Sequence, residues 1–201
     1  MVLLHALGEQ SGTWDSVAEE FAGIFRVFAI DLRGHGDSDR PGAYSFELMR
    51  DDVLGALDQL GLDRVTLLGH SMGGTLVYLV AEKQPSRVDR LILEDAPPPS
   101  PRDRPIPERP AGRLPFDWAV VPAIARQLND PDPVWWERLT DIIAPTLIIA
   151  GGPSSHIPQD KLAEVAARLP CCTLRTIPVG HHIHATRPAE FAATVLNFLR
   201  T

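Results

Sequence analysis

The stretch VTLLGHSMGGTLVYLV, residues 65–80, decides the fold of this chain. An apolar, β-branched run typical of a buried strand leads into GHSMG at 69–73, and a helix-forming segment without an early breaker follows. Strand, G-x-S-x-G and helix in this order predict a nucleophile elbow, a sharp turn that exposes Ser71. The flanking glycines let the backbone fold tightly, and the helix N-terminus favours developing negative charge. The alternative is a glycine-rich structural turn.

Strand-like and helix-like segments alternate along the chain, which predicts an α/β fold with a mostly parallel sheet and helices on both faces. The strand candidates are apolar nearly without alternation, as in strands that are buried on both faces. We expect strands at 1–7, 25–31, 64–69, 88–95, 145–151 and 172–178. We expect helices at 11–22, 45–60, 72–83, 158–169 and 188–199.

One proline-rich segment interrupts this alternation. Between Ala96 and Pro115 the sequence has eight prolines interleaved with arginines, which excludes a helix interior or a central strand and predicts an extended excursion. The arginines could contact an anionic substrate or form a solvated face. Two helices are expected after it, at 116–129 and 132–142. We therefore interpret residues 97–142 as a small helical lid inserted into a single domain, 1–201.

Composition and charge argue against several classes of partner. The chain has 201 residues, 44% of them hydrophobic, and a net charge of −7 without a basic stripe, so no nucleic-acid partner is expected. No apolar run approaches the roughly 20 residues that span a bilayer, and residues 1–4 lack the charged flank of a signal peptide, so no membrane partner is expected. The two cysteines are adjacent and give no disulfide framework, which suits a reducing compartment and predicts a cytoplasmic protein.

A serine hydroxyl becomes a useful nucleophile only when a base takes its proton. His181 is our candidate base, because it follows the last expected strand and precedes the final helix. A metal site built on His181 and its neighbours His182 and His184 is the rival. No carboxylate or thiol with ligand spacing joins them, so no metal is expected. Hydrogen-bonding roles suit the histidines in glycine-rich loops, which are His5, His35 and His70.

Acyl transfer also needs two N–H donors for the oxyanion. The backbone amide of Met72, which follows the nucleophile, is the first candidate. The second is the amide of Leu7, in the loop after the first expected strand. The alternative for residues 5–8 is a simple strand-ending turn.

Four motifs in order resemble the α/β-hydrolase superfamily over the whole chain. They are LLHALG at 3–8, DLRGHGDS at 31–38, GHSMG at 69–73, and Gly180-His181 with Pro188 and Phe191. The resemblance implies acyl transfer to water, often ester hydrolysis, without a cofactor. It does not specify a substrate.

Three departures from the family pattern bear on the site and on assembly. Ala6 replaces the usual glycine, which would strain the oxyanion loop if that position needs a positive φ. The family's two strands before residue 1 are absent, which makes 25–31 an exposed apolar edge. That edge predicts a homo-oligomer, poor solubility or a natural chain that begins upstream. Ser154 stands where the family usually has the acid, and a serine cannot stabilise an imidazolium.

The acid of a triad must then come from elsewhere. Glu94, at the end of the strand beside the nucleophile strand, is our candidate, since some α/β-hydrolases resemble this arrangement. Asp95 is its rival, because successive strand residues point to opposite faces. Glu94 and Asp95 could instead both be solvated acids at the end of the strand, which would leave a Ser71–His181 dyad. Asp160, in the first turn of an expected helix, is a weaker candidate.

These features together predict a serine hydrolase that cleaves an ester or related acyl compound through an acyl-enzyme intermediate. Ser71 attacks, His181 accepts the proton and Glu94 orients the histidine. The substrate would be a small molecule with an apolar portion, if the lid aromatics contact it rather than merely seat the lid; these are Phe116, Trp118, Trp135 and Trp136. The alternatives are a carbon–carbon bond hydrolase or perhydrolase with the same machinery, and a non-catalytic ligand-binding protein on this fold.

Overall fold

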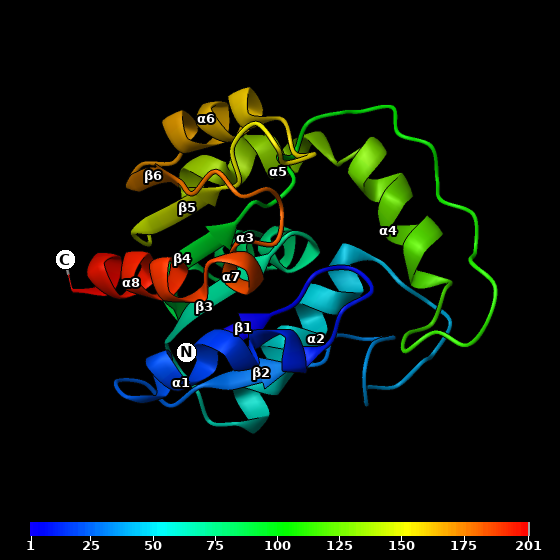
Figure 1. Ribbon diagram of the computed structural model, residues 1–201, viewed down its shortest axis with the longest axis horizontal. Coiled ribbons are helices and arrows are strands. Elements are labelled where there is room, and N and C mark those ends of the chain that lie inside the picture. Colours follow the sequence, from blue (N-terminus) through cyan, green and yellow to red (C-terminus); the bar gives the residue numbers. More distant parts are fainter. Residues whose placement is uncertain (201) are drawn as a thin grey trace.

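The computed structural model describes residues 1–200, and a six-stranded parallel sheet lies at its centre (Figure 1). The strand order is β2-β1-β3-β4-β5-β6, and every neighbouring pair is parallel. All six expected strands are present, which confirms the α/β fold. Their bounds are β1 Val2–Leu4, β2 Phe28–Ile30, β3 Val65–His70, β4 Val88–Glu94, β5 Thr146–Ala150 and β6 Cys172–Thr176.

Helices cover both faces of the sheet (Figure 1). On one face α1 (Asp15–Ala22) packs against α8 (Pro188–Leu199), and on the other α2 (Phe46–Gln59), α3 (Met72–Lys83) and α6 (Gln159–Arg168) contribute to a larger core. Neighbouring β3 residues divide between the two cores, because side chains alternate along a strand. The sequence did not predict two short helical segments, η2 Pro85–Arg87 and α7 Ile183–Thr186. The expected helices at 11–22 and 132–142 each include a short 3₁₀ segment, η1 Ser11–Trp14 and η3 Leu139–Asp141.

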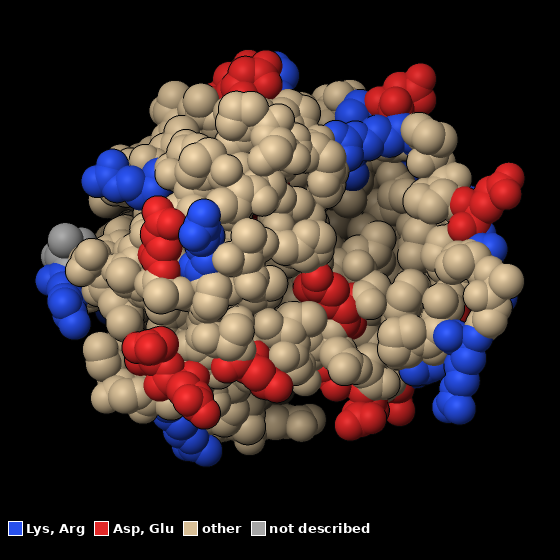
Figure 2. Space-filling view, viewed as in Figure 1, with Lys and Arg blue, Asp and Glu red and all other residues tan. Residues whose placement is uncertain are grey.

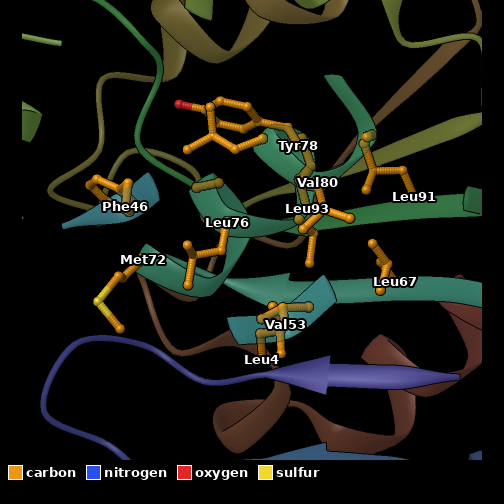
Figure 3. Close-up of a cluster of buried hydrophobic side chains, with 14 of the residues drawn as sticks. Leu4, Phe46, Val53, Leu67, Met72, Leu76, Tyr78, Val80, Leu91 and Leu93 are labelled. Carbon is orange, nitrogen blue, oxygen red and sulfur yellow. The ribbon is translucent and has the colours of Figure 1, made fainter. Parts of the chain in front are cut away.

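The strand–helix unit β3–α3 is buried almost throughout. All six residues of β3 are buried, and so are the residues of α3 from Met72 to Glu82. Figure 3 shows Leu67 of β3 and Leu76 of α3 within one apolar cluster with Leu91 and Leu93 of β4. This packing fixes the turn between β3 and α3 on a rigid support.

The segment between β4 and β5 contains irregular structure followed by two helices. A strap of irregular structure, residues 96–115, precedes α4 (Val120–Asn129) and α5 (Pro133–Arg138). The strap runs along the outer side of α4 (Figure 1). Two hydrogen bonds fasten it there: the Arg102 amide donates to the Asn129 carbonyl at 2.9 Å, and the Asn129 side-chain amide donates to the Arg104 carbonyl at 2.7 Å.

Strand β2 forms one edge of the sheet, as the sequence predicted. Its residues are only partly buried, and the Arg26 guanidinium lies 4.7 Å from the centre of the Phe28 ring. Self-association through this edge stays a prediction. None of the helices within residues 1–200 combines the length and the apolar character that crossing a bilayer requires.

Candidate active site

Ser71 occupies a strained turn between β3 and α3. Its backbone angles are φ 52° and ψ −115°, a region that non-glycine residues seldom adopt. The two motif glycines are required by close backbone approach. A Cβ on Gly69 would lie 2.2 Å from the Gly73 carbonyl oxygen, and one on Gly73 would lie 2.2 Å from the Leu4 carbonyl oxygen. The G-x-S-x-G spacing is therefore a steric requirement of this turn.

His181 lies in the turn after β6, and three contacts fix it. Its Nδ1 atom is 2.7 Å from Oδ2 of Asp95, which leaves Nε2 free to face a reactant. The Nε2–H of His70 donates to the His181 carbonyl oxygen at 2.9 Å. The preceding residue, Gly180, adopts φ 90° and donates its amide to the Gly151 carbonyl at 2.9 Å. Asp95 therefore orients the ring, and the other two contacts fix the backbone that carries it.

Asp95 is fully buried at the turn that follows β4, with φ 43°. Besides His181, its carboxylate accepts hydrogen bonds from the Gly151 amide at 2.8 Å, from the Ser155 hydroxyl, and from Gln159 Nε2 at 3.3 Å. Burial by itself raises the pKa of Asp95. The hydrogen bonds from His181, Ser155 and Gly151 outweigh it and hold the pKa below its ordinary value. The carboxylate therefore stays ionised at neutral pH.

The expectation that Glu94 would reach His181 is wrong. Glu94 is the last residue of β4, and its carboxylate accepts the backbone amide of His184 at 2.8 Å and the His184 ring Nδ1–H at 2.8 Å. Successive residues point to opposite faces, and the positive φ of Asp95 turns the second acid towards His181. The rival, Asp95, is the acid that the fold brings to the histidine.

The position where the family usually has its acid is occupied by Ser154 and supplies no carboxylate to His181. Next to Ser154, Ser155 donates its hydroxyl to Asp95 and accepts the Ile157 amide at 2.9 Å. The loop after β5 thus supports an acid that comes from the neighbouring strand.

A second buried polar cluster lies behind His181. Ligand-type atoms of His70, Glu94 and His184 lie within 4.8 Å of one another, which makes them the described group most similar to a metal-binding set. Both Glu94 oxygens already accept hydrogen bonds from His184. Burial opposes ionisation of Glu94, but His70 and His184 outweigh it and lower the pKa of Glu94. The histidines of the cluster therefore stabilise the negative charge of Glu94. Nδ1 of His70 also lies 3.5 Å from Oε2 of Glu9.

Glu94→Gln is expected to lower the free energy of unfolding at pH 7 by about 1–3 kcal/mol, because an uncharged amide oxygen accepts weaker hydrogen bonds than a carboxylate and the new NH₂ group cannot accept from the His184 ring. The folded-state pKa of Glu94 is lowered, so its stabilisation is present above the ordinary value of 4.5 and is lost as pH falls through the folded-state pKa. Urea unfolding of both proteins should therefore show a gap at pH 7 that narrows in acid. Glu19→Gln, on the exposed side of α1, is the control. Equal stability of Glu94→Gln and wild type at pH 7 would contradict the assignment.

In the loop after β1, the backbone amide of Leu7 is available to donate to an oxyanion. The Ala6 amide donates to Glu9 at 3.3 Å, and the Gly8 amide donates to Nε2 of His35 at 3.1 Å. The Leu7 amide between them has no acceptor within residues 1–200. Positive φ falls on Gly8, at 83°, and not on Ala6, so the alanine carries no backbone strain of that kind.

The loop histidines His5 and His35 act as local hydrogen-bonding groups, as interpreted from the sequence. Nε2 of His5 accepts the Leu32 amide at 3.0 Å, and its Nδ1–H donates to the Ala6 carbonyl at 2.7 Å. Burial is the main cause that lowers the pKa of His5 to about 4. Neutral His5 thereby ties the loop after β1 to the loop after β2.

A cavity of about 350 Å³ opens at the carboxyl edge of the sheet. Ser71, His181, Leu7 and Met72 all line it, so the predicted nucleophile, base and amide donors share one space. Its apolar wall comes mainly from α4 and the strap. Figure 2 shows a hollow between the body of the molecule and the strap, with basic side chains on one rim and acidic ones opposite.

The four aromatic residues of the insertion lie outside this cavity lining. Trp135 is buried against Phe46, with ring centres 5.4 Å apart, and the Arg168 guanidinium lies over Trp136 at 5.1 Å. Phe116 stacks on His35 at 5.6 Å. These three aromatics seat the insertion, and the cavity's apolar surface comes instead from Val121, Ala125, Leu128 and Ile157.

His156 is a cavity residue that the sequence reasoning did not single out. Its ring centre lies 4.1 Å from that of His181. Burial, together with the charges of His181 and Arg104, lowers the pKa of His156 to about 4, so it is neutral at pH 7. Its position in the loop after β5, at the edge where the other site residues gather, is the signal that could have identified it.

Comparison with known proteins agrees with this geometry. A family model described as alpha/beta hydrolase fold matches residues 1–119, more than half of the chain. Over 249 aligned residues the chain is 27% identical to sn-1-specific diacylglycerol lipase ABHD11 of Danio rerio, covering 100% of this chain and 78% of the relative. It is 26% identical to a putative esterase/lipase of Haemophilus influenzae, covering 99% and 82%.

A solved structure gives the same result for the fold. A thermophilic esterase from Thermogutta terrifontis superposes with a TM-score of 0.80 at 25% identity, over 99% of this chain and 88% of that one. The names of these relatives are those of lipases and esterases, which supports a hydrolase on this fold. By its family model, its sheet and its strand–turn–helix unit around Ser71, the chain belongs to the alpha/beta hydrolase fold family.

Proposed function

We propose that this hydrolase is a serine hydrolase that cleaves an ester or a related acyl compound through an acyl-enzyme intermediate. One observation carries the proposal. Ser71, on its strained turn, shares a cavity with His181, whose Nδ1 is 2.7 Å from the buried carboxylate of Asp95. Nucleophile, base and orienting acid are the parts of a Ser-His-Asp triad.

The first half of the reaction forms the acyl-enzyme. Ser71 Oγ attacks the carbonyl carbon while Nε2 of His181 takes the hydroxyl proton. Asp95, ionised and hydrogen-bonded to Nδ1, stabilises the imidazolium without taking its proton. The negative oxygen of the tetrahedral intermediate accepts from the amides of Leu7 and Met72, and the second of these lies at the N-terminus of α3.

The second half releases the acid. It begins from the acyl-enzyme, which is complete once the first tetrahedral intermediate has collapsed and the departing alkoxide has taken the proton from His181 Nε2. A water molecule then attacks the acyl carbon while the neutral His181 takes a proton from it. The second tetrahedral intermediate expels Ser71 Oγ, which regains its proton from the histidine, and the carboxylic acid leaves.

The cavity supports a small-molecule substrate with an apolar portion. Val121, Ala125 and Leu128 of α4 offer an aliphatic surface beside Ser71. The test of the proposal is hydrolysis of p-nitrophenyl esters of increasing acyl length by the purified protein. Release of p-nitrophenol well above the uncatalysed rate is expected, and no release at any chain length would contradict the proposal.

A further inference from the structure

The strap contributes two arginines to the cavity that contains Ser71. Arg102 and Arg104 are half-buried, and both line that cavity. Their backbones are tied to the end of α4 through Asn129, and an Arg104 Nη donates to the His156 carbonyl oxygen. The backbone contacts therefore place both residues at the wall of the site, and the Arg104 side chain is also held there by its hydrogen bond.

These two guanidinium groups lack an acidic partner. Within residues 1–200, neither forms an ion pair with a carboxylate, and the Nε atom of Arg102 is buried without a hydrogen-bond partner. Burial and the charge of Arg104 lower the pKa of Arg102 to about 10, so it is still a cation at pH 7. A half-buried cation with a buried N–H donor that lacks an acceptor is stabilised when an anion joins it.

The other charged group of the cavity does not neutralise them. The Glu9 carboxylate lies 3.3 Å from Nε2 of His182 and 3.5 Å from Nδ1 of His70. It also accepts a hydrogen bond from the backbone amide of Ala6. Hydrogen bonding and charge from His70 outweigh the effect of burial and lower the pKa of Glu9 to about 2. In a chain of net charge −7, the strap side of this cavity therefore concentrates positive charge.

We infer that Arg102 and Arg104 bind a carboxylate group of the substrate whose acyl carbon Ser71 attacks. The inference rests on the proposed function and names its substrate class: an ester or related acyl compound that carries a negative charge. A guanidinium presents paired N–H donors that match the oxygens of such groups. The aliphatic surface of α4 accommodates the carbon chain that links the two ends.

The test compares esters that differ only in charge. The p-nitrophenyl hemiesters of succinate, glutarate and adipate are each paired with the same compound capped as a methyl ester. The 4-carboxyphenyl and 4-(methoxycarbonyl)phenyl esters of butyrate place the charge on the alcohol instead. The measured quantity is the ratio of kcat/KM for the charged to the capped ester. Since one sample hydrolyses both, a misfolded fraction cancels in the ratio.

Wild type is expected to prefer one charged ester over its capped partner, and the position of that charge identifies which side of the substrate meets the arginines. Arg102→Gln and Arg104→Gln should each lower the ratio roughly 10- to 100-fold, as for the loss of a charge-assisted hydrogen bond. Arg109→Gln is the matched control, because Arg109 lies on the same strap, is exposed and does not line the cavity. A wild-type ratio near one in every pair, or equal ratios in all three variants, would overturn the inference while leaving ester hydrolysis intact.

Calorimetric titration with glutarate separates the two proposals further. If no ester is hydrolysed, the proposed function fails, and the inference is read from binding alone. Glutarate should then bind wild type and the Arg109→Gln control, and bind Arg102→Gln and Arg104→Gln at least tenfold more weakly. Equal binding to all four proteins, or binding to none, would overturn the anion site.

Discussion

Ser71→Ala should lower kcat for a p-nitrophenyl ester by roughly 10⁴–10⁶-fold, because it removes the atom that forms the acyl-enzyme. The substitution deletes one hydroxyl from a half-buried side chain, and the turn depends on Gly69 and Gly73 rather than on that hydroxyl. The fold should therefore persist. Steady-state hydrolysis and circular dichroism of the same preparation measure the two properties.

The matched control for this substitution is Ser154→Ala, at the position where the family's acid usually stands. Ser154 makes no contact with His181 that the triad uses, so its removal should change kcat by less than tenfold. A Ser71→Ala protein that keeps a tenth of wild-type activity would show that Ser71 is not the nucleophile.

Asp95→Asn is the substitution with the second largest expected effect, a loss in kcat of roughly 10²–10⁴-fold with little change in KM. The amide cannot balance the charge of the imidazolium, and its NH₂ group favours the wrong tautomer of His181. The Gly151 amide can still donate to the amide oxygen at the Oδ1 position, and the Ser155 hydroxyl, which contacts Oδ2, can instead accept from the new NH₂ group, so the loop after β5 should keep its position.

Glu94→Gln separates an orienting acid from a merely buried one. Glu94 and Asp95 are adjacent in sequence and both fully buried, but only Asp95 contacts His181. Per mole of folded protein, Glu94→Gln should lower kcat by less than tenfold, although it lowers stability. The reverse order of effects would transfer the orienting role to Glu94, and two near-neutral variants would leave a Ser71–His181 dyad.

Local patterns were enough to predict most of the fold. Most of the parallel strands contain a short apolar run, and some helices have a recognisable start signal, such as Ser45 capping α2 and Pro188 in the first turn of α8. The Ser71 turn was also predictable, because the G-x-S-x-G spacing meets a steric need of the strand–helix turn. The proline content of residues 96–115 likewise excluded regular structure.

The choice between Glu94 and Asp95 could not be made from the sequence. It depends on where β4 ends and on the φ of 43° at Asp95, which a non-glycine residue adopts only when surrounding contacts impose it. The seating of Trp135 against Phe46 is similarly a long-range contact between the insertion and α2. Composition indicates an aromatic insertion, but only the packing decides which residues face the cavity.

Labelling with a fluorophosphonate probe tests the central claim most directly, because only a serine activated by a base reacts rapidly with it. The native protein should gain one label, which peptide mass spectrometry locates on Ser71. The label should be absent from Ser71→Ala and from protein denatured before treatment. A native, folded protein that takes up no label, or takes it up on another serine such as Ser155, would contradict the account and favour a non-catalytic binding protein on this fold.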